Sequence, residues 1–155
     1  MDWLNQLQLL GHVALAGLLG GLIGAERERA HKPAGLRTHI LVAAAAALLV
    51  QLGYLGISHF GPAALPDGGE HQPIRADPIR IMQAIILGIS FLGAGTILRE
   101  RDSRVEGLTT AATILLTATV GITTALRQYL LAAGVTVLAL LVLTVLGWLE
   151  RRSRC

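Results

Sequence analysis

Five long apolar runs constrain this chain more than any other feature of its sequence. Crossing the hydrocarbon core of a bilayer as a helix takes about 20 consecutive, mostly apolar residues. Runs of that length recur through the 155 residues and are separated by short polar segments. We therefore predict an all-α, polytopic membrane helix bundle in a single domain. Its five transmembrane helices are expected at about residues 7–25, 39–57, 79–98, 108–126 and 129–149.

The composition supports lipid rather than water as the solvent. Hydrophobic residues make up 53% of the chain and charged residues 15%, against roughly 25% charged residues in an average soluble domain. Many of the 18 glycines lie inside the apolar runs, and glycine is more frequent in membrane helices than in soluble ones. The basic residues fall in short clusters between the runs, so we reject nucleic-acid binding despite the net charge of +3.

The distribution of Lys and Arg predicts the orientation, because cytoplasmic loops of membrane proteins are enriched in these residues. Segments 26–38, 99–107 and 150–155 hold ten of the 13 basic residues, all on one side of the membrane if there are five crossings. We therefore expect the N-terminus outside and the C-terminus in the cytoplasm. One alternative is a re-entrant unit formed by runs four and five around Arg127-Gln128, which would move the C-terminus to the other side.

Small and hydroxyl-bearing residues recur at helical spacing in runs one, three and four. Such faces let helices approach closely in lipid, and we favour this interpretation over a permeation path lined by hydroxyls and backbone carbonyls. We accordingly expect these three runs at the centre of the bundle, with runs two and five outside. The residues are Gly17, Gly20, Gly21 and Gly24; Gly88, Ser90, Gly93 and Gly95; and Thr110, Thr113, Thr117, Gly121 and Thr124.

Polar residues gather at the start of the third run. Asp77 precedes Pro78 and is expected to cap the helix, because Asp accepts hydrogen bonds from the first turn and Pro suits the first helical position. Arg80 and Gln83 lie further in. Arg80 is expected to extend outward toward water or to pair with Asp77. Gln83 needs a hydrogen-bond partner, so it is expected either to link two helices or to form part of a site.

A second polar group ends the first run. Glu26 and the charges that follow it resemble a solvated rim, but Glu26 lies under the glycine face and can point into the bundle. Glu26 and Asp77 are expected about 30 Å apart across the membrane, so one copy cannot combine them in a site. We interpret His12 and His39 as hydrogen-bonded structural residues.

The acidic residues also limit the expected chemistry. No run has two acidic residues in its interior, so we expect no dehydrated Mg²⁺ site built by the chain alone. Nucleophile–base and paired-carboxylate arrangements are also missing from the sequence, and we expect neither an enzyme nor a resident cofactor.

Three stretches resemble the signatures of the MgtC/SapB family. They run from Gly24 to Val42, from Asp77 to Gln83 together with Gly88 to Ile97, and from Val105 to Thr113, and their order and spacing match over about residues 7–121. The resemblance gives a set of candidate functional residues. They are Glu26, Arg27, Gly35, Arg37, Thr38, Asp77, Arg80, Gln83, Gly93, Gly95, Thr109 and Thr110.

The resemblance implies a multi-pass protein of the bacterial inner membrane, linked to Mg²⁺ homeostasis, growth in low Mg²⁺ and, in pathogens, survival inside macrophages. Members are often described as regulators of other membrane proteins, including ATP synthase and P-type Mg²⁺ transporters. We expect such a regulator, with a homo-oligomer as a further option. The alternative is a transporter or channel for Mg²⁺ or another small cation. Many members continue into a soluble C-terminal domain, and we expect this chain to be a short form without it.

Overall fold

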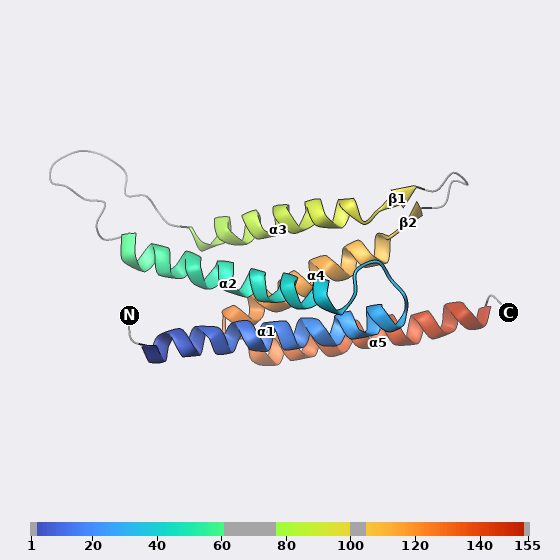
Figure 1. Cartoon of the computed structure of the whole chain (residues 1–155), viewed down its shortest axis with the longest axis horizontal. Coiled ribbons are helices and arrows are strands. Elements are labelled where there is room, and N and C mark those ends of the chain that lie inside the picture. The colour runs from blue at the N-terminus through green and yellow to red at the C-terminus, as the bar shows by residue number, and fades with distance from the viewer. Residues whose placement is uncertain (1–2, 61–76, 100–104, 154–155) are drawn as a thin grey trace.

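The chain folds into a bundle of long helices, as the apolar runs predict (Figure 1). A computed structural model describes residues 3–60, 77–99 and 105–153. Within these residues the helices are α1 (Trp3–Arg29), α2 (Leu36–Phe60), α3 (Pro78–Gly95), α4 (Leu108–Ala125) and α5 (Tyr129–Ser153). All five are long and apolar enough to cross a membrane. The predicted all-α membrane bundle is therefore confirmed, while its orientation stays a prediction.

The third helix is shorter than predicted at its C-terminal end. It stops at Gly95, where Thr96 caps it: the Thr96 backbone N–H and hydroxyl both donate to the Gly93 carbonyl oxygen, at 3.0 and 2.8 Å. The chain then forms β1 (Leu98–Arg99), which pairs antiparallel with β2 (Val105–Glu106). The expected span to residue 98 is wrong here, because these residues enter a strand pair instead of continuing the helix.

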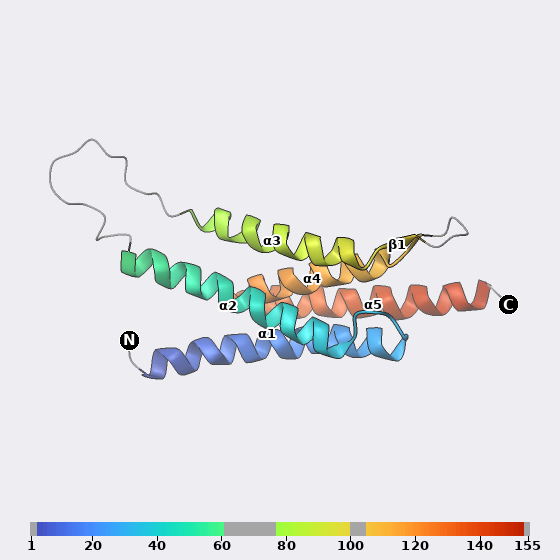
Figure 2. The same cartoon turned by 45° about the horizontal axis from the view of Figure 1, so that its top comes forward.

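The centre of the bundle is formed by α1, α2 and α4. Half of the span of α4 and 33% of the span of α2 are buried, against only 11% of the span of α3. Figures 1 and 2 both show α3 along the outside of the bundle, next to α2 and α4. The expected arrangement, with runs one, three and four central and run two facing lipid, is therefore wrong for the second and third helices.

The alanine-rich face of α2 explains this difference. Ala43 and Ala47 are fully buried, and the Cβ of an alanine at Gly20 of α1 would lie 2.7 Å from the Ala43 Cβ. A Cβ at Gly121 of α4 would in turn collide with the Ala43 carbonyl oxygen. Alanine allows this close approach because its side chain is a single methyl group. The alanine run therefore packs against two helices.

The fifth helix follows α4 through a tight turn at Arg127, whose φ is 60°. Near its start, the Tyr129 hydroxyl is 2.7 Å from Nε2 of His12 in α1, which supports the interpretation of His12 as a hydrogen-bonded structural residue. Because α4 and α5 are each long enough to cross a membrane, the structure favours two crossings over one re-entrant unit.

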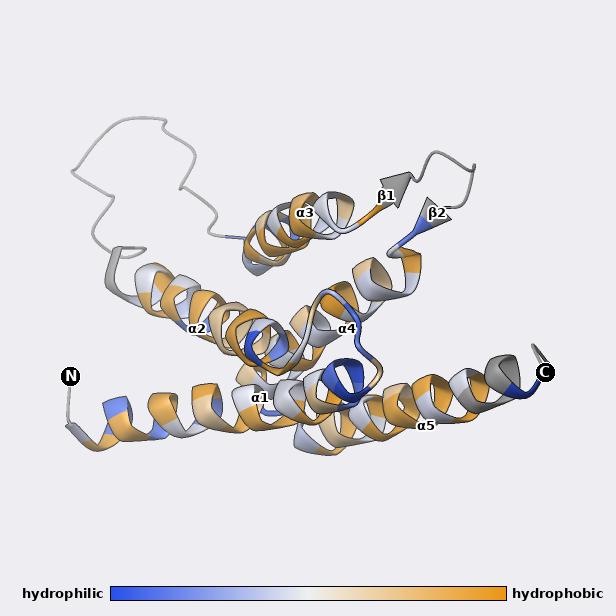
Figure 3. Cartoon of the chain, turned by 45° about the vertical axis from the view of Figure 1, so that its right-hand side comes forward, coloured by the Kyte–Doolittle hydropathy of each residue, from blue (hydrophilic) through white to orange (hydrophobic). Residues whose placement is uncertain are grey.

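The outer surface of the bundle is apolar. Figure 3 shows hydrophobic residues along the lengths of the helices and hydrophilic residues at the connection between α1 and α2. Leu87 and Phe91 of α3 are 75% and 81% exposed, and Leu130 of α5 is 89% exposed. Soluble monomers rarely expose so much contiguous apolar surface, so these side chains face the bilayer or another protein within it.

Candidate functional site

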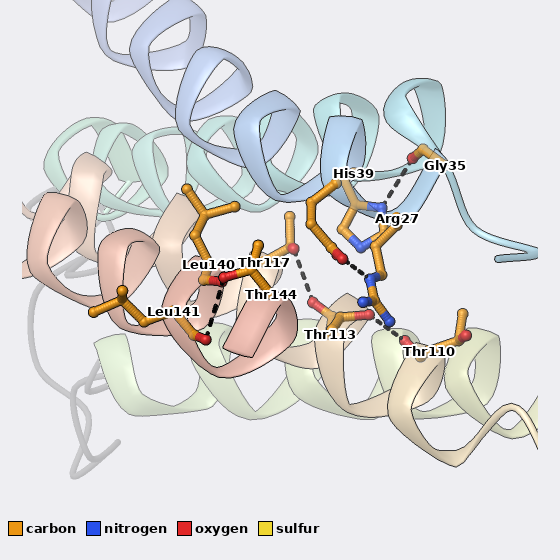
Figure 4. Close-up of polar contacts among 10 residues, drawn as sticks. Arg27, Gly35, His39, Thr110, Thr113, Thr117, Leu140, Leu141 and Thr144 are labelled. Atoms are coloured by element: carbon orange, nitrogen blue, oxygen red, sulfur yellow. Dashed lines mark hydrogen bonds and ion pairs between the residues drawn. The ribbon is translucent and has the colours of Figure 1, made fainter. Parts of the chain in front are cut away.

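A buried polar cluster joins α1, α2 and α4 at one end of the bundle (Figure 4). We call it the Arg27 cluster. Arg27 is 4% exposed, His39 is fully buried, and Thr110 and Thr113 are 2% and 4% exposed. The Glu26 side chain, which is paired with Arg27, is 14% exposed. Strongly polar groups are therefore held inside the protein at the crossing of three helices.

The glycine face of α1 makes room for this cluster. A Cβ at Gly24 would lie 2.8 Å from the Leu36 Cα and 2.9 Å from the His39 Cβ. The start of α2 therefore lies directly against the backbone of α1. Arg27 comes three residues after Gly24 and so shares its helix face. The glycine spacing that predicted close packing also places Arg27 beside His39.

Glu26 neutralises the buried guanidinium of Arg27. The Arg27 Nε donates to Glu26 Oε2 at 2.6 Å, which forms an ion pair. Figure 4 shows the rest of the Arg27 guanidinium directed toward Thr110 and Thr113 of α4. A buried charge is strongly destabilising unless it is paired. Glu26 therefore points into the bundle, as its position under the glycine face suggested.

His39 is oriented by the backbone of the preceding connection. Its Nδ1 lies 2.9 Å from the Gly35 carbonyl oxygen, and because a carbonyl only accepts, Nδ1 is the nitrogen that donates. His39 Nε2 is buried and has no hydrogen-bond partner in the structure. Among the described side chains of the Arg27 cluster, this nitrogen is the fully buried atom that lacks a partner.

Glu28 fixes the same connection from outside the cluster. Its Oε2 accepts from the backbone N–H of Leu36 at 2.9 Å, at the start of α2. A Cβ at Gly35 would lie 2.9 Å from this carboxylate oxygen. Glycine at this position thus allows Glu28 to cap α2, and the cap in turn holds the Gly35 carbonyl that orients His39.

The threonines of α4 use their hydroxyls within their own helix. Thr113 donates to the Thr110 carbonyl at 2.8 Å and Thr117 to the Thr113 carbonyl at 2.8 Å. Thr124 donates to the Val120 carbonyl at 2.7 Å. With their donors used in this way, the buried threonines act as small packing residues. This supports the interpretation of the threonine face as a packing surface.

The other candidate residues at this end lie around the cluster. Gly93 packs against Ala111 of α4, with 3.4 Å between a Cβ at Gly93 and the Ala111 Cβ. Gly95 has open space around it. Thr38 is partly buried, and both Arg37 and Thr109 are exposed.

Asp77, Arg80 and Gln83 lie at the opposite end of α3 (Figure 1). Asp77 Oδ1 accepts from the Ile79 backbone N–H at 2.9 Å, which confirms the predicted helix cap. Arg80 and Gln83 are exposed. Of these described residues, Asp77 and Arg80 form no ion pair with each other, and Gln83 has no hydrogen bond. The structure therefore separates these three residues from the Arg27 cluster.

Sequence reasoning missed part of the buried polar set. The sequence predicts Thr113 and Thr117 as packing residues and His39 as a structural residue, and it does not predict that they lie beside Arg27. Gln51 of α2 was not singled out, although it is 5% exposed and both polar atoms of its amide lack a partner. The available signal was a lone glutamine inside a long apolar run. Across the residues with described positions, no three His, Cys, Asp or Glu side chains are placed to hold a metal ion.

Comparison with known proteins places this fold in a family. The model of the MgtC family matches residues 13–152. Protein SapB of Bacillus subtilis is 32% identical over 98% of this chain and 62% of its own length. The protein named "Putative magnesium transporter YhiD" of Escherichia coli K12 is 38% identical over 89% of this chain and 60% of its own length. Protein MgtC of Salmonella typhimurium LT2 is 42% identical over 81% of this chain and 46% of its own length.

The chain thus spans about half to three-fifths of the length of these relatives. No solved structure matches it. The family match covers nearly all of the chain, including most of α1, all of α2 to α4 and the Arg27 cluster. The chain is therefore a multi-pass membrane protein that belongs to the MgtC family.

Proposed function

We propose that this protein serves Mg²⁺ homeostasis in the bacterial inner membrane by regulating other membrane proteins, without conducting Mg²⁺ or catalysing a reaction itself. The observation that carries the proposal is the buried guanidinium of Arg27 where α1, α2 and α4 meet. The link to Mg²⁺ is supported by the name of the Escherichia coli relative, "Putative magnesium transporter YhiD".

The chemistry of the Arg27 cluster supports regulation over conduction. Mg²⁺ prefers octahedral oxygen coordination and loses its water reluctantly. Glu26 is the carboxylate of the cluster, and it is already paired with Arg27. A divalent cation could use this carboxylate only by displacing the guanidinium, which would then be buried without its counter-charge. The cluster is thus suited to holding three helices together.

Exposed charge at the same end offers a surface for partners. Arg29, Lys32 and Arg37 are exposed around the connection between α1 and α2. Under the predicted orientation this surface faces the cytoplasm. Basic surfaces of this kind steer acidic partners and determine which partners bind. By family resemblance, the partner is another membrane protein, such as ATP synthase or a cation transporter.

The alternative function is transport of Mg²⁺ or another small cation. The name of the Escherichia coli relative, which contains the words "magnesium transporter", favours it. Because Glu26 and Asp77 lie at opposite ends of the bundle (Figure 1), a conducting site would need residues from more than one copy. Asp77 and Gln83 are its best candidates, since both are exposed on α3.

A growth experiment combined with a flux experiment separates the two functions. Bacteria that lack their own relative are grown in low Mg²⁺ with this chain, and the purified chain is tested in liposomes that contain a Mg²⁺-sensitive dye. The proposal predicts rescued growth without Mg²⁺ flux. Flux that is abolished by Asp77→Ala or Gln83→Ala would establish transport and overturn the proposal.

A further inference from the structure

The exposed face of α3 carries a line of residues with heptad spacing, three of which are polar. Arg80, Gln83, Leu87, Ser90 and Ala94 follow one another at intervals of three, four, three and four residues, and all five are exposed. We call this line of residues the α3 seam. Intervals of three and four alternate along the contact line of two helices that cross at a shallow angle, in water and in membranes.

The bundle itself does not use this seam. α3 turns its other face inward, where Ile85 joins the core with Ile114 of α4 and Gly93 contacts Ala111. Leu87 stays 75% exposed. A Cβ at Gly88, next to the seam, would have nothing within 4 Å, so the packing of this chain gives no reason for glycine there.

Contact of the α3 seam with lipid would be energetically unfavourable because of the polar side chain of Gln83. The 18 residues of α3 span about 27 Å, slightly less than the hydrocarbon core of about 30 Å. Both ends of α3 must therefore lie at the interfaces. Gln83 comes five residues after Pro78, which places it about 7.5 Å along the helix axis and inside the hydrocarbon. An amide without partners in hydrocarbon is strongly unfavourable.

We propose that the α3 seam binds the α3 seam of a second copy of this chain, in a parallel pair about a two-fold axis along the membrane normal. All copies insert in the same orientation, so each seam residue meets its own counterpart at the same depth. The Gln83 amide both donates and accepts hydrogen bonds. Two such amides can satisfy each other across the axis, as isologous contacts require.

The end of the seam adds charge complementarity. Asp77 and Arg80 are exposed and form no ion pair within the chain, although the structure describes both. In a parallel pair Arg80 faces its own counterpart, and Asp77 of each copy lies about 4.5 Å along the axis from Arg80 of the other, within reach of that long side chain, so the two carboxylates offset the charges of the two facing guanidinium groups. Both residues are close to the interface, where such ion pairs are tolerated and where Arg can extend toward water. A lipid-facing α3 or an unrelated partner would not supply these matched groups at matched depths.

Cysteine crosslinking in native membranes tests the pairing. In a Cys155→Ser background, Leu87→Cys and Ser90→Cys place a thiol in the seam. Ile86→Cys, at a position that is 41% exposed, and Leu130→Cys, at one that is 89% exposed, are controls outside it. Mild oxidation with copper phenanthroline is expected to give a disulfide-linked dimer at Leu87 and Ser90 and little at Ile86 and Leu130.

Three results would overturn the proposal: no dimer at either seam position, equal dimer at all four positions, or crosslinking only to a different polypeptide. Co-purification of two differently tagged copies with the native seam guards against damage by the substitutions, and failure to co-purify also counts against the pair.

Gln83→Ala in the Ser90→Cys chain should lower the dimer fraction roughly threefold to tenfold, in line with polar contacts between membrane helices. Gln128→Ala, a glutamine outside the seam, should leave it unchanged. An unchanged dimer fraction in Gln83→Ala would show that the Gln83 hydrogen bond does not hold the two copies together, which would contradict the proposal.

Discussion

Gly20 of α1 and Ala43 of α2 are in such close contact that no side chain fits between them. A Cβ at Gly20 would lie 2.7 Å from the Ala43 Cβ and 2.7 Å from the His39 carbonyl oxygen. This contact brings α2 into the centre of the bundle and places His39 beside the end of α1. The fold and the Arg27 cluster therefore depend on the same close approach.

Gly20→Ala should destabilise the protein by about 1–3 kcal/mol, because the added methyl forces two packed helices apart. Gly11→Ala, in the same helix but with nothing within 4 Å of the added Cβ, is the matched control. It should be neutral or slightly stabilising, since alanine favours helix over glycine. Melting temperatures of the purified variants in detergent compare the two. Equal effects at both positions would show that the close contact is not important for stability.

The Arg27–Glu26 pair should behave as a unit. Glu26→Gln leaves a buried guanidinium without its counter-charge and should cost about 3–5 kcal/mol. The double variant with Arg27→Met removes both charges and should be more stable than Glu26→Gln alone. Arg37→Met, at an exposed position, should change the stability by less than about 0.5 kcal/mol. Unfolding free energies of the wild type, Glu26→Gln, Arg27→Met and the double variant measure the coupling, and strictly additive losses would contradict a buried pair.

Gly107 begins α4 with a φ of 90°, which side-chain-bearing residues rarely adopt. A Cβ there would also collide with the Thr96 carbonyl oxygen. Gly107→Ala should therefore cost about 1–3 kcal/mol or more and lower the yield of folded protein. Gly56→Ala, where the added Cβ meets nothing within 4 Å, should fold normally. Wild-type yield and melting temperature in Gly107→Ala would mean that β2 and α4 meet in another way.

The orientation can be tested with a thiol reagent that does not cross membranes. Cys155 is the only cysteine of the sequence, and under the predicted orientation it faces the cytoplasm and should be labelled only after lysis. Ala63→Cys in a Cys155→Ser background falls in segment 61–76, outside the described residues, and should be labelled in intact cells. The reverse pattern would place the N-terminus in the cytoplasm.

The positions of the helices follow from the hydropathy of the sequence, because every crossing has to span the same hydrocarbon thickness; α1, α2 and α5 extend beyond the predicted spans. The cap formed by Asp77 was also predictable, since it depends on neighbouring residues alone. The arrangement of the helices was not. An alanine such as Ala43 is equally compatible with lipid and with a close helix contact, and only its position opposite Gly20 and Gly121 decides between them.

The Arg27 cluster was only partly predictable for a similar reason. The pattern of alternating charges after the first run predicts a solvated rim, which describes the exposed residues Glu28 and Arg29. Arg27 differs because it shares a helix face with Gly24, against which His39 packs. The end of α3 was missed because Leu98 is apolar enough to continue a helix, while its strand pairing depends on the backbone conformation of Gly107.

The most direct test of the central claim is Mg²⁺ flux into liposomes that contain the purified wild-type chain and an internal Mg²⁺-sensitive dye. An ionophore added at the end of each run confirms that the dye responds. We predict that the dye signal matches that of protein-free liposomes until the ionophore is added, because the Glu26 carboxylate is already paired with the Arg27 guanidinium, which is buried where α1, α2 and α4 meet. Protein-dependent Mg²⁺ entry that is lost in Gln83→Ala would contradict this account and identify the chain as a transporter.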